Sequence, residues 1–396
     1  MANDAKLDEP YADAFRRRGL TPLDEAVFIT RPRMPDRQAF DAQLDRIWES
    51  RWLTNSGSFH NALEARVADF ARAHACLTCN GTMSLLMALR LFGVKPGDRV
   101  ITTPFTFPAT VHAIEWLGAE PVFADVEAAT GNICAASVAE RLDDRVTAIM
   151  ATHVYGTPCD HARLEPLADR HGLALIYDAA HAFGVTVEGE SVLRWGDAAS
   201  VSFHATKLFS TVEGGAVFVA EEAQKARLDR MRNFGILNEN EIAMSGLNMK
   251  MSELHAAFGT LTLDGVEAEI ARRARIAARY SDRLGRLPGL RVISRGEGFT
   301  PNWSYYAIAI DPDAFGVSRD TVHAALRSLN INLRKYFHPL VSEVPVYAAL
   351  PTARADGLPE SAKLAREVLC LPIYGELSDA AVELLIEAFE ALSAAA

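Results

Sequence analysis

One lysine, Lys207, lies in a polar stretch between two short apolar runs of the chain. The runs at 201–203 and 217–219 are expected to be buried strands, because a Glu-Gly-Gly turn separates them. A lysine on a loop between buried strands loses hydration, which lowers its pKa toward that of a nucleophilic free amine. That is the chemistry of a lysine that forms a Schiff base. A solvated surface lysine is the alternative, although the neighbouring Ser202 and His204 favour a reactive site.

A possible anion site lies upstream of this lysine. The predicted strand 75–79 runs into Asn80-Gly81-Thr82-Met83, and a helix is expected over residues 84–91. Unpaired N–H groups and the helix dipole converge where a strand, a glycine turn and a helix N-terminus meet. Gly81 and Thr82 are therefore expected to bind a phosphate group. An ordinary helix cap formed by Thr82 is the alternative.

An acidic residue, Asp178, follows the apolar run 173–177, which is expected to be a strand. Ligands bind at the carboxyl ends of strands in open α/β sheets, so this carboxylate is a candidate binding group. Taken alone, the aspartate could instead cap a helix. Since Lys207 lies downstream and the Gly81-Thr82 turn upstream, cofactor binding explains the three features together.

Strands and helices are expected to alternate around these candidate sites. The pattern predicts strands at 98–103, 121–124, 146–152 and 173–177, and helices at 109–117, 136–142 and 164–171. This alternation fits right-handed crossovers, and hence a mostly parallel sheet with helices on both faces. No G-x-G-x-x-G motif follows the first strand, which argues against a dinucleotide cofactor.

The chain is expected to divide into three parts. Residues 1–27 are interpreted as a peripheral N-terminal segment, and residues 28–260 as a large cofactor-binding domain. The pattern over 252–287 predicts one long helix, which Pro288-Gly289 ends. Residues 261–396 are accordingly interpreted as a linking helix and a small C-terminal α/β domain.

Composition limits the classes of partner. The chain has 396 residues, 49% of them hydrophobic, and can bury a large core. Its net charge is 40 − 51 = −11, which argues against a nucleic acid as partner. The charged N-terminus lacks an apolar signal and no run is long enough to span a membrane, so a soluble cytoplasmic protein is expected. Five scattered cysteines suit reduced thiols, and Cys76 and Cys79 are expected to be packing residues, so no metal is predicted.

Three short motifs carry a resemblance to a known family. SFHATK (202–207) and EGGA (213–216) resemble the lysine segment of the DegT/DnrJ/EryC1/StrS aminotransferases, and DAAH (178–181) resembles their aspartate motif. These are pyridoxal 5'-phosphate (PLP) enzymes that aminate nucleotide-linked keto-sugars. The resemblance runs from Ile29 to Tyr347 and covers most of the chain. It implies an aspartate-aminotransferase-like α/β fold (PLP fold type I), with a mostly parallel sheet flanked by helices and a smaller C-terminal α/β domain. It also implies a homodimer with shared active sites.

The resemblance implies roles for individual residues of this chain. Lys207 would bind PLP covalently and move protons, and Asp178 would face the pyridine nitrogen and keep it protonated. The other residues that would bind the cofactor are Gly81, Thr82, Phe107, His181, Ser202 and, from the neighbouring subunit, Asn248. The residues that would bind substrate are Thr54, Asn55, His204, Lys335 and Tyr336.

Several of these residues have a structural alternative. Thr54 and Asn55 could lie on a plain loop between helices, and Phe107 could belong to the core. His181 could be a structural histidine. The segment around Lys335 could be a solvated turn.

The resemblance also implies the position of amination. In this family S-F-H-x-x-K is typical of enzymes that place the amine at C4, and S-F-Y-P-G-K of those that act at C3, so His204 and Ala205 imply C4 chemistry. The implied reaction converts a nucleotide-linked 4-keto-6-deoxy sugar, dTDP-4-keto-6-deoxyglucose, to the 4-amino sugar with glutamate as amino donor. The sequence does not decide between this dTDP-linked sugar and a UDP- or GDP-linked one. The alternatives are a C3-aminotransferase, a sugar dehydratase, whose members have histidine in place of the lysine, and a non-catalytic sugar-binding or regulatory protein on the same scaffold.

Overall fold

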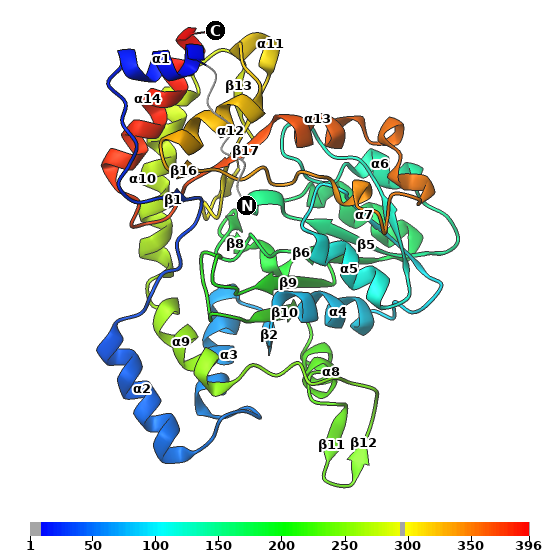
Figure 1. Ribbon diagram of the computed structural model, residues 1–396. Coiled ribbons are helices and arrows are strands. Elements are labelled where there is room, and N and C mark those ends of the chain that lie inside the picture. The colour runs from blue at the N-terminus through cyan, green and yellow to red at the C-terminus, as the bar shows by residue number, and fades with distance from the viewer. Residues whose placement is uncertain (1–8, 294–297, 396) are drawn as a thin grey trace.

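A seven-stranded sheet forms the centre of the larger part of the molecule (Figure 1). The computed structural model describes residues 9–293 and 298–395. In spatial order the strands are β2 (His74–Thr78), β10 (Gly215–Val219), β9 (Ala198–Ser202), β6 (Ala174–Asp178), β5 (Val146–Thr152), β3 (Arg99–Thr102) and β4 (Glu120–Phe123). Within this sheet β10 runs antiparallel to both neighbours, and the other pairings are parallel. The predicted mostly parallel sheet is confirmed.

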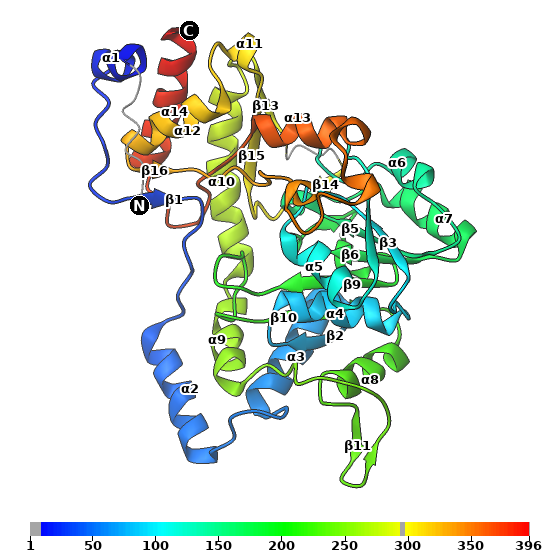
Figure 2. The same ribbon diagram turned by 45° about the vertical axis from the view of Figure 1, so that its right-hand side comes forward.

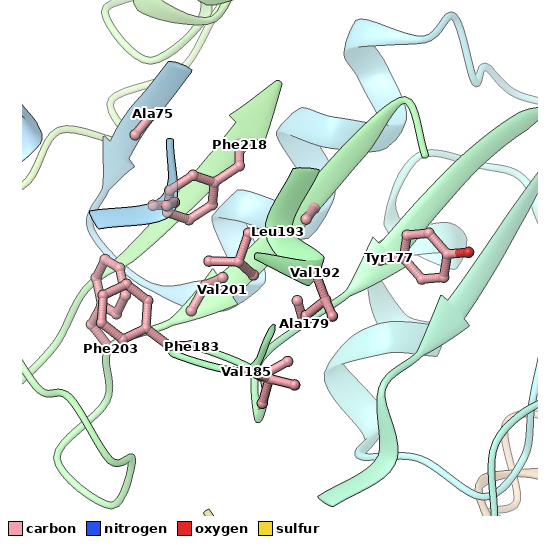
Figure 3. Close-up of a cluster of buried hydrophobic side chains, with 14 of the residues drawn as sticks. Ala75, Tyr177, Ala179, Phe183, Val185, Val192, Leu193, Val201, Phe203 and Phe218 are labelled. Atoms are coloured by element: carbon pink, nitrogen blue, oxygen red, sulfur yellow. The ribbon is translucent and has the colours of Figure 1, made fainter. Parts of the chain in front are cut away.

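Helices cover both faces of this sheet, as the alternation predicted. One face packs against α3 (Ser58–Ala71), α6 (Ala135–Glu140), α7 (His161–His171) and α9 (Glu253–Leu263), and the other against α4 (Gly81–Leu91), α5 (Pro108–Trp116) and α8 (Glu222–Met231). Strand side chains alternate, so Leu77 packs in the first core and Cys76 in the second. Figure 3 shows Phe183, Phe203 and Phe218 in the first core.

A smaller sheet lies in the C-terminal part of the chain (Figure 2). Its antiparallel strands are, in spatial order, β13 (Leu290–Val292), β15 (Tyr306–Ile310) and β17 (Val368–Leu371). The helices of this part are α10 (Val266–Leu284), α11 (Pro312–Phe315), α12 (Arg319–Ser328), α13 (Pro359–Glu367) and α14 (Asp379–Ala395). Tyr280, Leu326 and Phe389, from α10, α12 and α14, share one core with this sheet.

The N-terminal segment packs on this smaller part. The helix α1 (Glu9–Arg17) lies against α14 and buries Ala14 and Phe15 in the same core (Figure 1). The strand β1 (Val27–Phe28) pairs in parallel with β16 (Ile331–Asn332). Residues 1–8 of the segment interpreted as peripheral lie outside the described residues. Because of these contacts, we propose that residues 9–28 belong to the small domain instead of forming a separate segment.

The predicted long helix over 252–287 is in fact two helices, α9 and α10, which meet at Gly265. In a continuous helix the carbonyl of Thr262 would accept a hydrogen bond from the N–H of Val266. Here the N–H of Gly265 and the guanidinium of Arg33 donate to that carbonyl instead, at 3.3 and 2.9 Å. A Cβ atom on residue 265 would lie 1.8 Å from the guanidinium of Arg33, so this side chain would have to move if residue 265 were not glycine. Gly265 is a local signal for this break that the sequence analysis missed, whereas the contact with Arg33 comes from a residue far away in the sequence.

A hairpin and a helix project from the large part in both views (Figures 1 and 2). They are the hairpin β11 (Ile236–Asn238) and β12 (Glu241–Ile242), which follows α8, and α2 (Arg37–Ser50), which packs on α9. The remaining short elements are β7 (Thr186–Val187), β8 (Glu190–Ser191), β14 (Phe299–Thr300) and the 3₁₀ turns η1 (Val154–Gly156), η2 (Val192–Arg194), η3 (Val341–Glu343), η4 (Pro351–Ala353) and η5 (Ala355–Gly357). None of the described helices combines the length and apolar character that crossing a membrane requires.

Candidate active site

A cavity of about 290 Å³ lies at the carboxyl ends of β5, β6 and β9. Parallel α/β sheets bind their ligands at this edge. The large part supplies most of the wall, and the C-terminal part contributes three aromatic side chains. The lining residues are Asn80, Gly81, Thr82, Leu85, Thr106, Phe107, Ala109, Thr152, Asp178, Ala180, His181, Ser200, Ser202, His204, Thr206, Lys207, Glu213, Tyr305, Tyr336 and Phe337.

Lys207 lies in this cavity on the loop between β9 and β10, where the sequence predicted it. Its backbone N–H donates to the carbonyl of His204 at 2.9 Å, and its Nζ lies 5.7 Å from the centre of the Tyr305 ring. Burial lowers the pKa of Lys207 to about 8, and the carboxylate of Asp178 opposes that shift. Because an ordinary lysine has a pKa of about 10.4, far more of this amine is unprotonated near neutral pH.

Asp178 ends β6 and is 4% exposed. Its Oδ1 accepts from the N–H of Ala180 at 3.0 Å, and its Oδ2 accepts from the hydroxyl of Thr110 at 2.6 Å. Burial raises the pKa of Asp178, while the two hydrogen bonds and the charge of Lys207 lower it. Residues 179–184 form turns, so the alternative of a helix cap does not apply. The carboxylate therefore lies in the cavity wall, held by donors that favour its ionised form.

His181 is buried beside these two residues. Its Nδ1 accepts from the N–H of Tyr155 at 3.2 Å, and its ring lies parallel to that of Phe337. Burial, assisted by the charge of Lys207, lowers the pKa of His181 well below its ordinary value. The imidazole is therefore neutral at neutral pH and carries its proton on Nε2, where it can donate to an oxygen of a ligand.

The first turn of α4 forms one end of the cavity. The side chain of Asn80 caps this helix, since its Oδ1 accepts from the N–H of Met83 at 2.9 Å. The alternative of a cap formed by Thr82 is therefore wrong. Gly81 and Thr82 instead line the cavity together with Ser202, at a helix N-terminus that favours an anion.

Three more predicted residues line the cavity. Phe107 occupies the N-cap position of α5. Its side chain is 54% exposed, so the alternative of a core phenylalanine does not hold. The Nδ1 of His204 lies 2.8 Å from Thr206 Oγ1, and its Nε2 lies 3.7 Å from the carboxylate of Glu213. Tyr336 completes the group on the C-terminal side.

Four predicted residues do not line this cavity. The Nζ of Lys335 pairs with the carboxylate of Asp320 at 2.5 Å, which directs it to α12. Thr54, Asn55 and Asn248 are exposed and lie outside the cavity formed by this chain.

Sequence reasoning missed several residues of the wall, among them Thr106, Thr152, Ser200 and Tyr305. Thr152 and Ser200 lie at or near the carboxyl ends of strands, so the rule that singled out Asp178 could have found them. Tyr305 precedes a strand of the smaller sheet, and no local signal relates it to Lys207.

Known proteins resemble this chain over nearly its whole length. A relative from Escherichia coli, named dTDP-4-amino-4,6-dideoxy-D-glucose transaminase, is 39% identical over 358 residues, which are 90% of this chain and 96% of that protein. A relative of the same name from Shigella dysenteriae is 36% identical over 92% of this chain and 98% of that protein. The crystal structure of DesI, determined in the presence of its TDP-sugar product, superposes with a TM-score of 0.88 at 35% identity and covers 95% of both chains. The family model of the DegT/DnrJ/EryC1/StrS aminotransferases matches residues 35–390. The chain therefore belongs to the DegT/DnrJ/EryC1/StrS aminotransferase family.

Proposed function

We propose that this protein is a PLP-dependent aminotransferase that converts dTDP-4-keto-6-deoxyglucose to the 4-amino sugar, with glutamate as amino donor. The observation that carries the proposal is the convergence of Lys207, Asp178 and the first turn of α4 on one cavity. The two relatives named for dTDP-4-amino-4,6-dideoxy-D-glucose and the likeness to DesI support the nucleotide and the C4 position.

The residues of the cavity fit PLP. This cofactor carries an aldehyde, a pyridine nitrogen and a phosphate, which match an amine, a carboxylate and a helix N-terminus. The Oγ of Ser200 is buried in the cavity wall and has no hydrogen-bond partner among the described residues. Since buried polar atoms are nearly always paired, this oxygen supports a polar ligand in the cavity. Lys207, Asp178, His181 and Phe107 would hold the ring, and Gly81, Thr82 and Ser202 the phosphate.

Lys207, Asp178 and the C-terminal aromatic side chains each have a task in this reaction. When bound, PLP supplies an electron sink for the carbanion that forms at the α-carbon of the amino donor. Lys207, with its pKa of about 8, would move the proton from that carbon to the cofactor in the first half of the reaction, and from the cofactor to C4 of the sugar in the second half. Asp178 keeps the proton on the ring nitrogen through its negative charge. The C-terminal aromatic side chains exclude water from the cavity.

We also propose a homodimer in which Asn248 completes the cavity of the partner. Among the described residues that line the cavity, Lys207 is the sole lysine or arginine, whereas a nucleotide sugar carries a diphosphate. Asn248 lies at the base of the projecting hairpin, and large apolar side chains are exposed on this hairpin, next to Asn248 and elsewhere on the large part. These exposed side chains are Trp52, Leu53, Ile236, Leu237, Ile242, Leu247 and Leu254. A second copy of the chain would cover them and bring the Thr54-Asn55 loop to a substrate.

The five cysteines of the chain support a reducing compartment. Cys76, Cys79, Cys134, Cys159 and Cys370 are all free thiols. Disulfides are rare in reducing compartments, so we place the reaction in the cytoplasm.

An absorption experiment tests the proposed function. The purified protein is loaded with PLP, treated with glutamate, and then given dTDP-, UDP- and GDP-linked 4-keto-6-deoxy sugars in turn. We expect glutamate to remove the visible band of the bound cofactor and the dTDP sugar to restore it, with the new amine at C4 by NMR of the product. An amine at C3 would establish the alternative regiochemistry. Absence of any band after PLP is added would favour a non-catalytic sugar-binding protein.

A further inference from the structure

Three buried threonines form a chain of hydroxyl groups that ends on Asp178. The Oγ1 of Thr110 lies 2.6 Å from Asp178 Oδ2, the Oγ1 atoms of Thr106 and Thr110 are 2.9 Å apart, and those of Thr106 and Thr152 are 3.1 Å apart. All three side chains are at most 2% exposed. Thr106 and Thr152 border the cavity, whereas Thr110 is fully buried, so water cannot replace its hydrogen bond to the carboxylate.

Neighbouring elements of the fold bring these side chains together. Thr106 precedes the N-cap of α5 and Thr110 lies in its first turn. This arrangement brings their two hydroxyl groups into contact. Thr152 ends β5, and it is the partner of Asp178 in the register between β5 and β6. Paired residues of adjacent strands point to the same side of a sheet, so the chain runs over the same edge as the carboxylate.

The hydroxyl chain has a single direction. A threonine hydroxyl has one proton, and an ionised carboxylate can only accept. The hydroxyl of Thr110 donates its hydrogen bond to Asp178, so in its contact with Thr106 it is the acceptor. The hydroxyl of Thr106 in turn donates a hydrogen bond to Thr110 and accepts one from Thr152. The three dipoles therefore all point their positive ends toward the carboxylate, and each one strengthens the next.

The carboxylate depends on these donors because it is buried. Burial raises the pKa of Asp178, and the hydrogen bond from Thr110 is the foremost of the contacts that oppose the rise, ahead of those of Ala180 and Lys207. With Thr110 on Oδ2 and Ala180 on Oδ1, both oxygens are also fixed in orientation. A buried carboxylate that lost the Thr110 donor would be protonated at a higher pH.

We infer that Thr110 is a positioning residue which, through the chain from Thr106 and Thr152, keeps Asp178 ionised and oriented toward the ring nitrogen of the cofactor. The inference rests on the proposed function, since it takes PLP as the ligand of this cavity. Thr110 does not line the cavity and acts through Asp178 alone.

The test measures PLP binding to the cofactor-free protein between acid and neutral pH. Thr110→Val keeps the shape of the side chain and removes the donor, Thr110→Ser keeps the donor, and Thr106→Val removes the donor to Thr110. The matched control is Thr102→Val, since Thr102 is fully buried on β3 and its hydroxyl has no partner among the described residues. Circular dichroism and urea unfolding confirm that each variant is folded.

We expect Thr110→Val to weaken PLP binding about tenfold at neutral pH, which is the scale of a lost hydrogen bond to a buried charge. Because Asp178 then protonates at a higher pH, binding should also fail at a higher pH than in the wild type. Thr106→Val should shift binding in the same direction by a smaller factor. Thr110→Ser and Thr102→Val should bind within about twofold of the wild type, since the donor to Asp178 remains.

Three outcomes would overturn the inference. The first is a folded Thr110→Val that binds PLP as tightly as the wild type at every pH. The second is an equal loss at all pH values that Thr110→Ser does not restore, which would show a role in packing alone. If Thr110→Val does not fold, a Thr106→Val variant with wild-type binding at every pH would decide against the chain. A wild-type protein that binds no PLP would instead refute the proposed function, and the inference with it.

Discussion

A Cβ atom on Gly81 would lie 2.7 Å from the Cβ of Ser202 and 3.1 Å from its Oγ. The first turn of α4 and the end of β9 thus touch at a point where no side chain fits. The absence of a side chain lets the first turn of α4 approach Ser202 closely, and both line the cavity. This contact explains in steric terms why glycine precedes Thr82 at the proposed phosphate site.

Substituting this glycine should damage the phosphate site. In Gly81→Ala the added methyl group must displace Ser202 or α4, and overpacking of this kind costs about 1–3 kcal/mol. We expect PLP to bind about tenfold more weakly or worse, measured by titration of the cofactor-free protein. The matched control is Gly357→Ala, whose new Cβ would approach only the flexible end of Arg141, at 3.0 Å. Equal PLP binding by both variants would exclude Gly81 from the phosphate site.

The low pKa of Lys207 should control the rate at which the cofactor attaches. The free amine, present above the pKa, is the form that reacts, so the rate of covalent attachment should rise with pH and reach half its maximum near pH 8. Attachment is measured by borohydride reduction and mass spectrometry, with Lys207→Ala as the negative control. Since the Asp178 carboxylate raises the pKa of Lys207, Asp178→Asn should move the midpoint to lower pH. A midpoint near that of ordinary lysine, about 10.4, would contradict the buried amine.

A buried ion pair between Glu64 and Arg232 should stabilise the fold at neutral pH. Burial raises the pKa of Glu64, but the charges of Arg232 and Lys225 more than offset this and hold it at about 2, below its model-compound value of 4.5. Removing one partner of a buried pair costs about 3–5 kcal/mol. Since Glu64 is part-buried and Arg232 keeps its pair with Asp229, Glu64→Gln should lower the free energy of unfolding at pH 7 by an amount at the lower end of that range.

The pH dependence of this effect has a definite sign. A depressed pKa contributes stability that is fully present above the unfolded value and is lost as the pH falls through the folded value. The difference between wild type and Glu64→Gln, measured by urea unfolding, should therefore shrink between about pH 4.5 and pH 2. Asp41→Asn, which breaks an exposed pair with Arg37, should change the stability by less than about 1 kcal/mol. A Glu64→Gln effect as small as this control would show that the network is not stabilising.

Mixing two inactive variants should reveal whether the active sites are shared. Lys207→Ala and Asn248→Ala each damage both sites of a homodimer. If Asn248 contacts the ligand in the partner's cavity, each site of a mixed dimer combines Lys207 of one chain with Asn248 of the other. One site then carries both substitutions, and the other site carries neither. Random mixing would then restore about a quarter of the wild-type activity.

The control for this experiment pairs residues of one cavity wall. Lys207 and Asp178 line the same cavity of one chain, so a mixture of Lys207→Ala and Asp178→Asn should restore nothing. Equal activity in the two mixtures would place Asn248 in the site of its own chain or outside any site.

The large sheet was predictable because its signals are local. The apolar run 146–152 coincides with β5, and the runs on either side of Lys207 became β9 and β10. Lys207, Asp178 and Gly81 were found by the same local logic, since each follows or precedes a short buried strand.

The features that were missed depend on partners distant in the sequence. The contact of Arg33 with the carbonyl of Thr262 at the break between α9 and α10 is one, and the ion pair that directs Lys335 to Asp320 on α12 is another. The role inferred for Thr110 exists only because α5 packs beside the end of β6. A residue type and its neighbours in the sequence carry no information on such pairs, so the sequence alone predicts strands better than contacts.

The packing of α1 on α14 determines the order in which the molecule can fold during synthesis. The seven strands of the large sheet all lie between residues 74 and 219, so they can pair before α10 has left the ribosome. The first helix, by contrast, waits for the last one, because Ala14 and Phe15 have their core neighbours on α14. Nascent chains fold domain by domain from the N-terminus, yet here the earliest residues are among the last to find their place. Until then the apolar face of α1, which carries Ala14 and Phe15, has no partner to cover it.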